Sequence, residues 1–195
     1  MLVVMCHGYQ GSQYDMIILL RSLKEVLPLA NYMLSKVNEA ETDGNIDEMG
    51  ERLAKEIEAY IHHYLDPEKV IINFLGHSMG GVIARSSLKH LQPNYENQFG
   101  FFCSLSSPHL GYLNGVDNMI KAGLWVIRKF KPAIQSLNQL SMEDNRNRRS
   151  TFMYRLSSNG TLRKFRKIIL LSSYEDSYVA WHSARISKTQ SNRTS

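Results

Sequence analysis

The sequence of 195 residues has no long hydrophobic run, no basic leader and only two cysteines. Its longest apolar stretches, such as residues 16–20, are far shorter than the roughly 20 residues that a membrane-spanning helix needs. The first residues carry neither a basic segment nor a cleavage site, so a secretory signal is not expected. These absences argue against membrane-spanning and secreted proteins and make a cytoplasmic protein the default expectation.

The two cysteines, Cys6 and Cys103, both fall in segments that are predicted to be strands. In a chain without a secretory signal they are better interpreted as buried free thiols than as a disulfide. Glycosylation sequons at 159–161 and 192–194 are then incidental. The sequence also lacks internal repeats and low-complexity tracts, and its length predicts one domain with a sizeable core.

Charge is unevenly distributed along a chain of otherwise ordinary composition. The net charge is +5, yet residues 121–167 contain twelve Lys or Arg and two acids, which leaves the remainder net negative. This basic segment could contact anionic lipid head groups, or it could be only a solvated face of an insertion. A nucleic-acid partner is not expected, because the basic residues accompany no recognisable nucleic-acid-binding motif.

Apolar patterns predict strands and helices in alternation. Strands are expected at 2–6, 32–34, 70–75, 99–105 and 167–171, and helices at 15–27, 46–64 and 82–91. Such alternation implies the α/β class, with a mostly parallel sheet and helices on both faces. Residues 112–166 break the rhythm and are predicted to form a helical, basic cap inserted between the last two strands. The predicted domain spans residues 1–186, and a disordered polar tail follows at 187–195.

The most informative motif is Gly-His-Ser-Met-Gly at residues 76–80. It follows a predicted buried strand and opens a predicted helix, which is the context of the nucleophile elbow of α/β-hydrolases. Gly76 and Gly80 leave room for a turn so tight that the serine backbone is strained. The N-terminus of the helix directs partial positive charge to the place where an oxyanion would form. Ser78 is therefore the predicted nucleophile; the alternative is a glycine-rich turn that only packs a helix on a sheet.

An esterase also needs backbone donors for the oxyanion and an acid that orients a base. One predicted donor is the Met79 amide, and the other is the Tyr9 amide in the turn His-Gly-Tyr-Gln-Gly at residues 7–11. Asp176 follows the last predicted strand and is the predicted acid; a local turn role for its carboxylate is the alternative. Acyl transfer by these groups needs no metal and no organic cofactor.

The base is the part of the triad that the sequence does not provide clearly. Only His182 lies beyond Asp176, six residues later and with no strand between them. A histidine so close in sequence would struggle to reach Ser78, so His182 is a poor candidate. His109 precedes the acid and is expected to be structural or to face the substrate.

Taken together, these motifs resemble the putative serine esterase family, lipase-like α/β-hydrolases of largely unassigned function. The similarity is greatest to a eukaryotic branch in which the hydrolase domain is C-terminal. It spans about residues 2–186 and is carried by segments 7–11, 76–80, 105–111, 123–125, 176–179 and 182–186. It implies an α/β-hydrolase fold, Ser78 as nucleophile, Asp176 as acid and a lipid or small-molecule ester as substrate.

The resemblance also implies where the sequence departs from the family. The family's histidine lies beyond residue 186, near a last strand, and residues 187–195 do not resemble that continuation. The expected domain is therefore truncated before its last strand and its catalytic histidine. Two functions stay open: a lipase-like serine esterase that acts through an acyl-serine intermediate, and a non-catalytic hydrolase-like binding module or inactive fragment.

Overall fold

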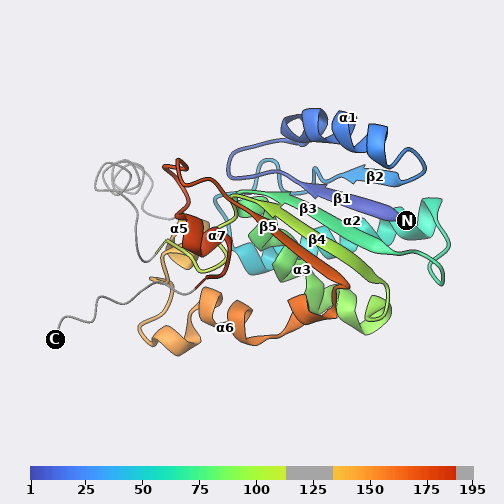
Figure 1. The fold of residues 1–195 in the computed structure, drawn as a ribbon. Helices are drawn as coiled ribbons and strands as arrows, with labels where there is room; N and C mark the ends of the chain where they lie inside the picture. Colours follow the sequence, from blue (N-terminus) through green and yellow to red (C-terminus); the bar gives the residue numbers. More distant parts are fainter. Residues whose placement is uncertain (113–133, 188–195) are drawn as a thin grey trace.

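Five strands form one parallel sheet in the computed structural model, which describes residues 1–112 and 134–187. The strands are β1 (Leu2–Cys6), β2 (Asn31–Leu34), β3 (Ile72–His77), β4 (Phe99–Leu105) and β5 (Lys167–Leu171). They are arranged in the order β2-β1-β3-β4-β5 (Figure 1). The predicted α/β class is therefore confirmed. Part of the predicted cap and most of the predicted tail lie outside the described residues.

Helices cover both faces of this sheet (Figure 1). The α-helices are α1 (Ile17–Val26), α2 (Ile46–Tyr64), α3 (Met79–Tyr95), α5 (Gln135–Leu140), α6 (Phe152–Ser158) and α7 (Trp181–Ala184). Short 3-10 turns occur at η1 (Gln13–Met16), η2 (Arg148–Ser150) and η3 (Thr161–Lys164). Strand β1 is fully buried, and its successive side chains point to opposite faces of the sheet. Val3 packs in the cluster under α1, and Val4 packs in the larger cluster under α2 and α3.

The path of the chain places two loops next to each other. From β1 the chain moves to one side to form β2, then returns to the other side of β1 to form β3. The carboxyl ends of β1 and β3 therefore meet where the strand order reverses, which is where open α/β sheets bind ligands. The loop after β1 carries Gly8 and Tyr9, and the turn after β3 carries Ser78.

Several predicted bounds agree with the structure, and those of β3 and α3 differ for local reasons. Strand β3 begins at Ile72 rather than at Val70, because the Val70 amide still belongs to the preceding turn and donates to the Asp66 carbonyl. Helix α3 is longer than residues 82–91. It starts directly after the turn at Ser78 and runs through Pro93 in its last turn.

The described part of segment 112–166 packs on the main core. Apolar residues of this part lie in the same buried cluster as α2 and α3; they are Leu140, Phe152, Met153, Leu156 and Phe165. The buried guanidinium of Arg85 on α3 donates to the Leu156 carbonyl at 3.0 Å. Basic side chains of this segment, such as Arg148 and Arg149, stay exposed on its outer side. The described part of the segment thus has an apolar inner side and a basic outer side.

Candidate active site at the carboxyl edge of the sheet

Ser78 lies between β3 and α3 in a backbone conformation that L-residues rarely adopt. Its φ is 52° and its ψ is −129°, a conformation that typically costs about 1–3 kcal/mol and persists only where the surroundings enforce it. Two hydrogen bonds hold the turn: the Ser78 amide donates to the Leu105 carbonyl at 2.8 Å, and the Ser78 carbonyl accepts from the Gly81 amide at 3.1 Å. The half-buried hydroxyl makes no hydrogen bond with any residue in the described ranges.

Close backbone contacts explain why glycine flanks this serine. A Cβ atom on Gly76 would lie 2.4 Å from the Gly81 Cα atom. A Cβ atom on Gly80 would lie 2.3 Å from the carbonyl oxygens of both Cys6 and His7. Side chains cannot be accommodated at such distances, so the glycines let the turn approach the end of β1. This approach brings the loop after β1 beside the serine.

The loop of residues 8–11 is a tight turn against Ser78; we call it the oxyanion loop after the role that we propose for it below. The Gly11 amide donates to the Gly8 carbonyl at 3.2 Å, and Gln10 has a φ of 52°. A Cβ atom on Gly8 would lie 3.0 Å from the Ser78 Cβ atom. The next amide along the chain is that of Tyr9, so this donor lies in the immediate neighbourhood of the serine.

Two backbone amides near Ser78 have no acceptor among the described residues. Met79 is the first residue of α3, so its amide has no acceptor inside the helix. Among the described residues, neither the Met79 amide nor the Tyr9 amide donates a hydrogen bond. Unpaired buried amides are rare in proteins, and Met79 is fully buried. Together with the dipole of α3, they form a place suited to a negatively charged oxygen.

Asp176 lies in the loop between β5 and α7, and its carboxylate is well supplied with donors. One oxygen accepts from the amides of Tyr178 at 2.9 Å and Val179 at 3.0 Å. Partial burial alone would raise the pKa of Asp176, but the Ser106 hydroxyl, these two amides and the neighbouring His77 outweigh it and lower that pKa. Asp176 is thus an ionised acceptor beside the turn that carries Ser78. The bonds from the Tyr178 and Val179 amides are also those expected if the Asp176 carboxylate had only a local turn role.

His182 and Ser78 are not brought into contact. His182 lies in the short helix α7, and its ring packs edge-on against Trp181 at a centroid distance of 5.9 Å. The helix is fastened by Ser183, whose hydroxyl donates to the Gly111 carbonyl at 2.7 Å and accepts from the Leu110 amide. Within residues 1–112 and 134–187, no histidine makes a hydrogen bond with the Ser78 hydroxyl.

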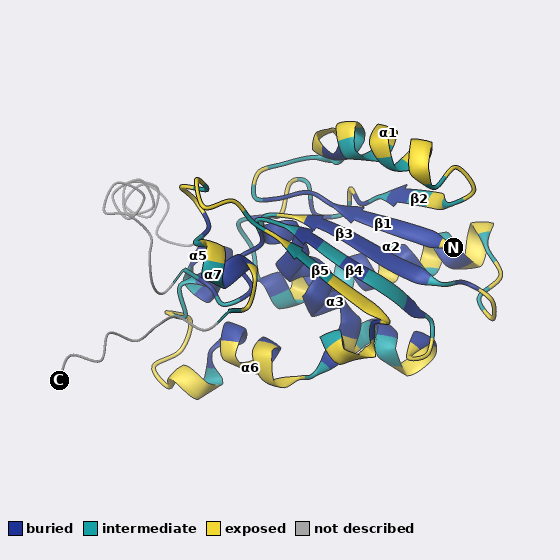
Figure 2. Ribbon diagram, viewed as in Figure 1, coloured by how far each residue is buried: buried dark blue, intermediate teal, exposed yellow. Residues whose placement is uncertain are grey.

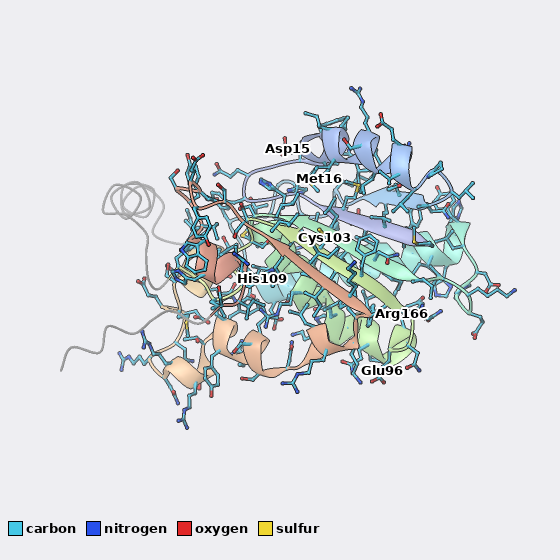
Figure 3. All side chains as sticks on the ribbon, in the orientation of Figure 1. Asp15, Met16, Glu96, Cys103, His109 and Arg166 are labelled. Carbon is cyan, nitrogen blue, oxygen red and sulfur yellow. The ribbon has the colours of Figure 1, made fainter. Side chains whose placement is uncertain are left out.

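His109 is a structural residue of the interior and is labelled in Figure 3. Its side chain is completely buried, and Nε2 lies 2.8 Å from the Ser104 hydroxyl. Burial, with a smaller effect of the Arg85 charge, lowers the pKa of His109 to about 3. A ring that is enclosed and neutral in this way is not available to a ligand, so of the two roles expected for His109 the structure supports the structural one.

Two residues that the sequence analysis did not single out contact the candidate site. Ser106, which also has a positive φ of 49°, hydrogen-bonds with the Asp176 carboxylate. The hydroxyl of Thr42 accepts the Gln10 amide at 3.0 Å. Thr42 belongs to no spacing pattern that sequence reasoning could use. Ser106 lies in segment 105–111, which carries part of the family resemblance, but its contact with Asp176 joins distant parts of the chain.

Three further observations bear on the expectations from the sequence. Cys6 and Cys103 are both free thiols, as predicted; Cys6 is buried as expected, whereas Cys103 is only half-buried. No helix in the described part of the chain combines the length and the apolar character required to cross a membrane. Residues 1–112 and 134–187 contain no group of three or more His, Cys, Asp or Glu side chains that could hold a metal ion.

Comparison with solved structures identifies the fold. A lipase of Bacillus licheniformis, BlEst2 in its mature form, superposes with a TM-score of 0.58 at 15% identity, over 86% of this chain and 64% of the lipase. Phospholipase PlaB of Legionella pneumophila superposes with a TM-score of 0.54 at 14% identity, over 93% of this chain and 42% of the phospholipase. At such identities the likeness shows the fold, which is that of the α/β-hydrolases, here with an open sheet. The chain spans less than two thirds of each protein's length.

A family comparison covers nearly the whole sequence. The family described as putative serine esterase (DUF676) matches residues 1–190. The matched range includes the strained turn at Ser78, the oxyanion loop and Asp176. The chain therefore belongs to this family of serine esterases, within the α/β-hydrolase fold.

Proposed function

We propose that this chain is a lipase-like serine esterase in which Ser78 is the nucleophile. The observation that carries the proposal is the strained turn at Ser78, which lies beside the Gly8 backbone and two amides that lack acceptors in the described part of the chain. Strain of this kind is retained where it positions a reactive group. A turn that only packed a helix on a sheet would need close glycine contacts but would leave no reason for unpaired donors at the same point.

The proposed reaction proceeds through an acyl-serine. The Ser78 oxygen attacks the carbonyl carbon of the ester, and the amides of Tyr9 and Met79 stabilise the oxyanion that forms. Collapse of this tetrahedral intermediate breaks the ester C–O bond and releases the alcohol, which carries away the proton that Ser78 has lost. Water then attacks the acyl-serine, and the carboxylic acid and the free Ser78 hydroxyl are released. Asp176 is the acid that would orient a histidine base. In this proposal the described residues provide the nucleophile, the oxyanion donors and the acid. None of them supplies a histidine base at Ser78.

We assign carboxylic esters of lipids as the substrate class and a cytoplasmic location to the protein. Lipids are favoured by the names of the lipase and the phospholipase that share the fold and by the exposed basic side chains between residues 146 and 167, which suit anionic head groups. Free thiols at Cys6 and Cys103 agree with a reducing compartment. No nucleic acid partner and no cofactor form part of this proposal.

Labelling with a fluorophosphonate probe tests the nucleophile directly. We expect wild-type protein to be labelled at Ser78 and to hydrolyse p-nitrophenyl esters, and Ser78→Ala to do neither. Ser22→Ala, which changes an exposed serine on α1, is the matched control and should behave as wild type. His182→Ala should also be labelled normally, because His182 packs on Trp181. Absence of labelling and hydrolysis in the wild-type protein would refute the enzymatic proposal.

A second candidate function is a non-catalytic module that binds lipid surfaces. It is favoured by one observation: no histidine in the described ranges contacts the Ser78 hydroxyl. Loss of a triad member costs orders of magnitude in turnover. Co-sedimentation with vesicles discriminates between the two candidates. Salt-sensitive binding to anionic vesicles without any labelling of Ser78 would favour the binding module.

A further inference from the structure

We propose that Thr42 is a positioning residue that holds the oxyanion loop in the conformation that carries the Tyr9 amide beside Ser78. The inference deepens the proposed function and depends on it for its catalytic meaning. Its structural basis is a set of contacts between the loop and residues 42–43, which follow β2 in the chain.

The central contact fixes one peptide unit of the turn. The Gln10 amide donates to the Thr42 hydroxyl at 3.0 Å, and Thr42 is only 3% exposed, so little water competes for this bond. Gln10 is the third residue of the turn from Gly8 to Gly11 and has a positive φ. A turn with positive φ at this position is of type II, which favours glycine there, whereas other residues favour type I.

The two turn types differ by a flip of the middle peptide, which is the unit whose amide Thr42 holds. Left-handed conformation costs a non-glycine residue about 1–2 kcal/mol. A net hydrogen bond contributes about 1 kcal/mol. These magnitudes are comparable, so the bond to Thr42 is large enough to decide which turn Gln10 adopts. A flip rotates ψ of Tyr9 and φ of Gln10, so the loop on which the Tyr9 amide is carried would lose this conformation.

A second contact holds the Tyr9 side chain on the same segment, residues 42–43, which we call the strap. The Tyr9 hydroxyl donates to an Asp43 carboxylate oxygen at 2.6 Å, and the Gln10 side chain donates to the Tyr9 hydroxyl at 3.3 Å. Burial and the bond to Asp43 raise the pKa of Tyr9, so the phenol remains a neutral donor at physiological pH. The oxyanion loop is therefore held at two consecutive residues.

The strap is itself anchored to α5. The buried Ser136 hydroxyl donates to the Thr42 carbonyl at 2.7 Å, and the Ser136 amide donates to the Asp43 carbonyl at 3.3 Å. The backbone that carries the Thr42 hydroxyl is thus fixed by its bonds to Ser136. Positional control of this kind matters because loss of one oxyanion donor reduces turnover by about 10²–10³-fold in other hydrolases.

The test compares Thr42→Val, which removes the acceptor at nearly constant shape, with Thr42→Ser, which retains it. Labelling by the fluorophosphonate is measured over a range of probe concentrations. Thr42→Val should lower the maximal labelling rate by about tenfold or more, with little change in the half-saturating concentration, because the lost stabilisation belongs to the transition state. Thr42→Ser should restore the rate. Thr161→Val, a buried threonine whose hydroxyl bonds to Asn159, is the matched control.

Hydrogen–deuterium exchange of residues 7–12 is a second readout that requires no activity. We expect faster exchange in Thr42→Val and wild-type exchange in Thr42→Ser and Thr161→Val. Unchanged exchange in Thr42→Val overturns the inference, and so does an unchanged labelling rate in a wild-type background that labels. A wild-type protein that does not label refutes the proposed function instead. In that case, faster exchange confined to Thr42→Val would still support the structural role of Thr42 in holding the loop.

Discussion

A Cβ atom on Gly8 would lie 3.0 Å from the Cβ atom of Ser78 and 3.5 Å from its Oγ atom. The backbone of the oxyanion loop therefore forms one wall of the space around the serine hydroxyl. Because parallel strands β1 and β3 are neighbours, the two loops that follow them meet at this edge of the sheet. The sheet order, rather than either motif alone, creates the contact.

Gly8→Ala should block this space while leaving the fold largely intact. The added methyl group would meet Ser78 and the His77 carbonyl oxygen at 3.0–3.5 Å, distances from which neighbours can move by a few tenths of an ångström. We expect labelling of Ser78 by the fluorophosphonate to slow by at least about tenfold. The thermal midpoint should change little. Gly44→Ala, where a Cβ atom would meet only the Glu41 carbonyl oxygen at 3.2 Å, is the control. Equal labelling of both variants would contradict the assignment of this wall.

Gly80→Ala should destabilise the whole fold. A methyl group there would lie 2.3 Å from two carbonyl oxygens, and backbone atoms of β1 cannot move aside without disturbing the sheet. We expect a loss of at least about 3 kcal/mol in the free energy of unfolding, measured in urea. Gly160→Ala provides a comparison, because Gly160 has a φ of 67° but open space around it. That variant should lose only about 1 kcal/mol. A smaller loss for Gly80 than for Gly160 would show that the close approach is not maintained in solution.

Stability should fall as the pH falls from 7 to 5, and His109 should contribute to this fall. Its pKa is about 3 in the folded protein and 6.5 in an ordinary environment, so only the unfolded chain binds a proton in this window. Unfolding is then favoured as pH decreases, by about 2 kcal/mol at pH 5 for this residue. Urea titrations at both pH values measure the difference. His109→Gln should reduce that difference by about the same amount, although it lowers stability at pH 7. An unchanged pH dependence in His109→Gln would show that His109 is not enclosed.

Strand β5 should promote self-association. It is one of the two edge strands of the described sheet, and it carries exposed apolar residues (Figure 2). Leu171 is 49% exposed and pairs in register with Leu105. Unpaired apolar edges favour pairing with another chain, so Leu171→Lys should reduce aggregation measured by light scattering. Ile18→Lys, at a 77% exposed position on α1, should have a smaller effect. Equal effects of both changes would point to general surface hydrophobicity instead.

Local patterns in the sequence were sufficient to predict several elements with their bounds. Strand β1, helix α2 and strands β4 and β5 agree with the predicted ranges. Their apolar residues repeat at the period of one element over its whole length, and turn residues mark the ends. The helix expected from residue 15 instead begins with the 3-10 turn η1, whose start is fixed by a reciprocal bond pair between Ser12 and Asp15. A propensity argument does not distinguish these two kinds of turn.

The candidate site was predictable only where neighbours in sequence define it. The strained turn at Ser78 was expected from two glycines and the change from strand to helix, and its φ has the expected sign. Thr42 could not be found in this way, because it is 32 residues from Gln10. The bond between Ser106 and Asp176 likewise depends on the pairing of β4 with β5.

The amino-acid sequence by itself determined the order of strands and helices, the turn at Ser78 and the membership of the family, because apolar periodicity and glycine spacing act over a few residues. The tertiary structure alone decided which groups surround that turn: Gly8 beside the hydroxyl, Thr42 behind the oxyanion loop, and His109 enclosed rather than exposed. These relationships arise only when a parallel sheet brings the carboxyl ends of its strands to one edge and excludes water from the layer beneath it.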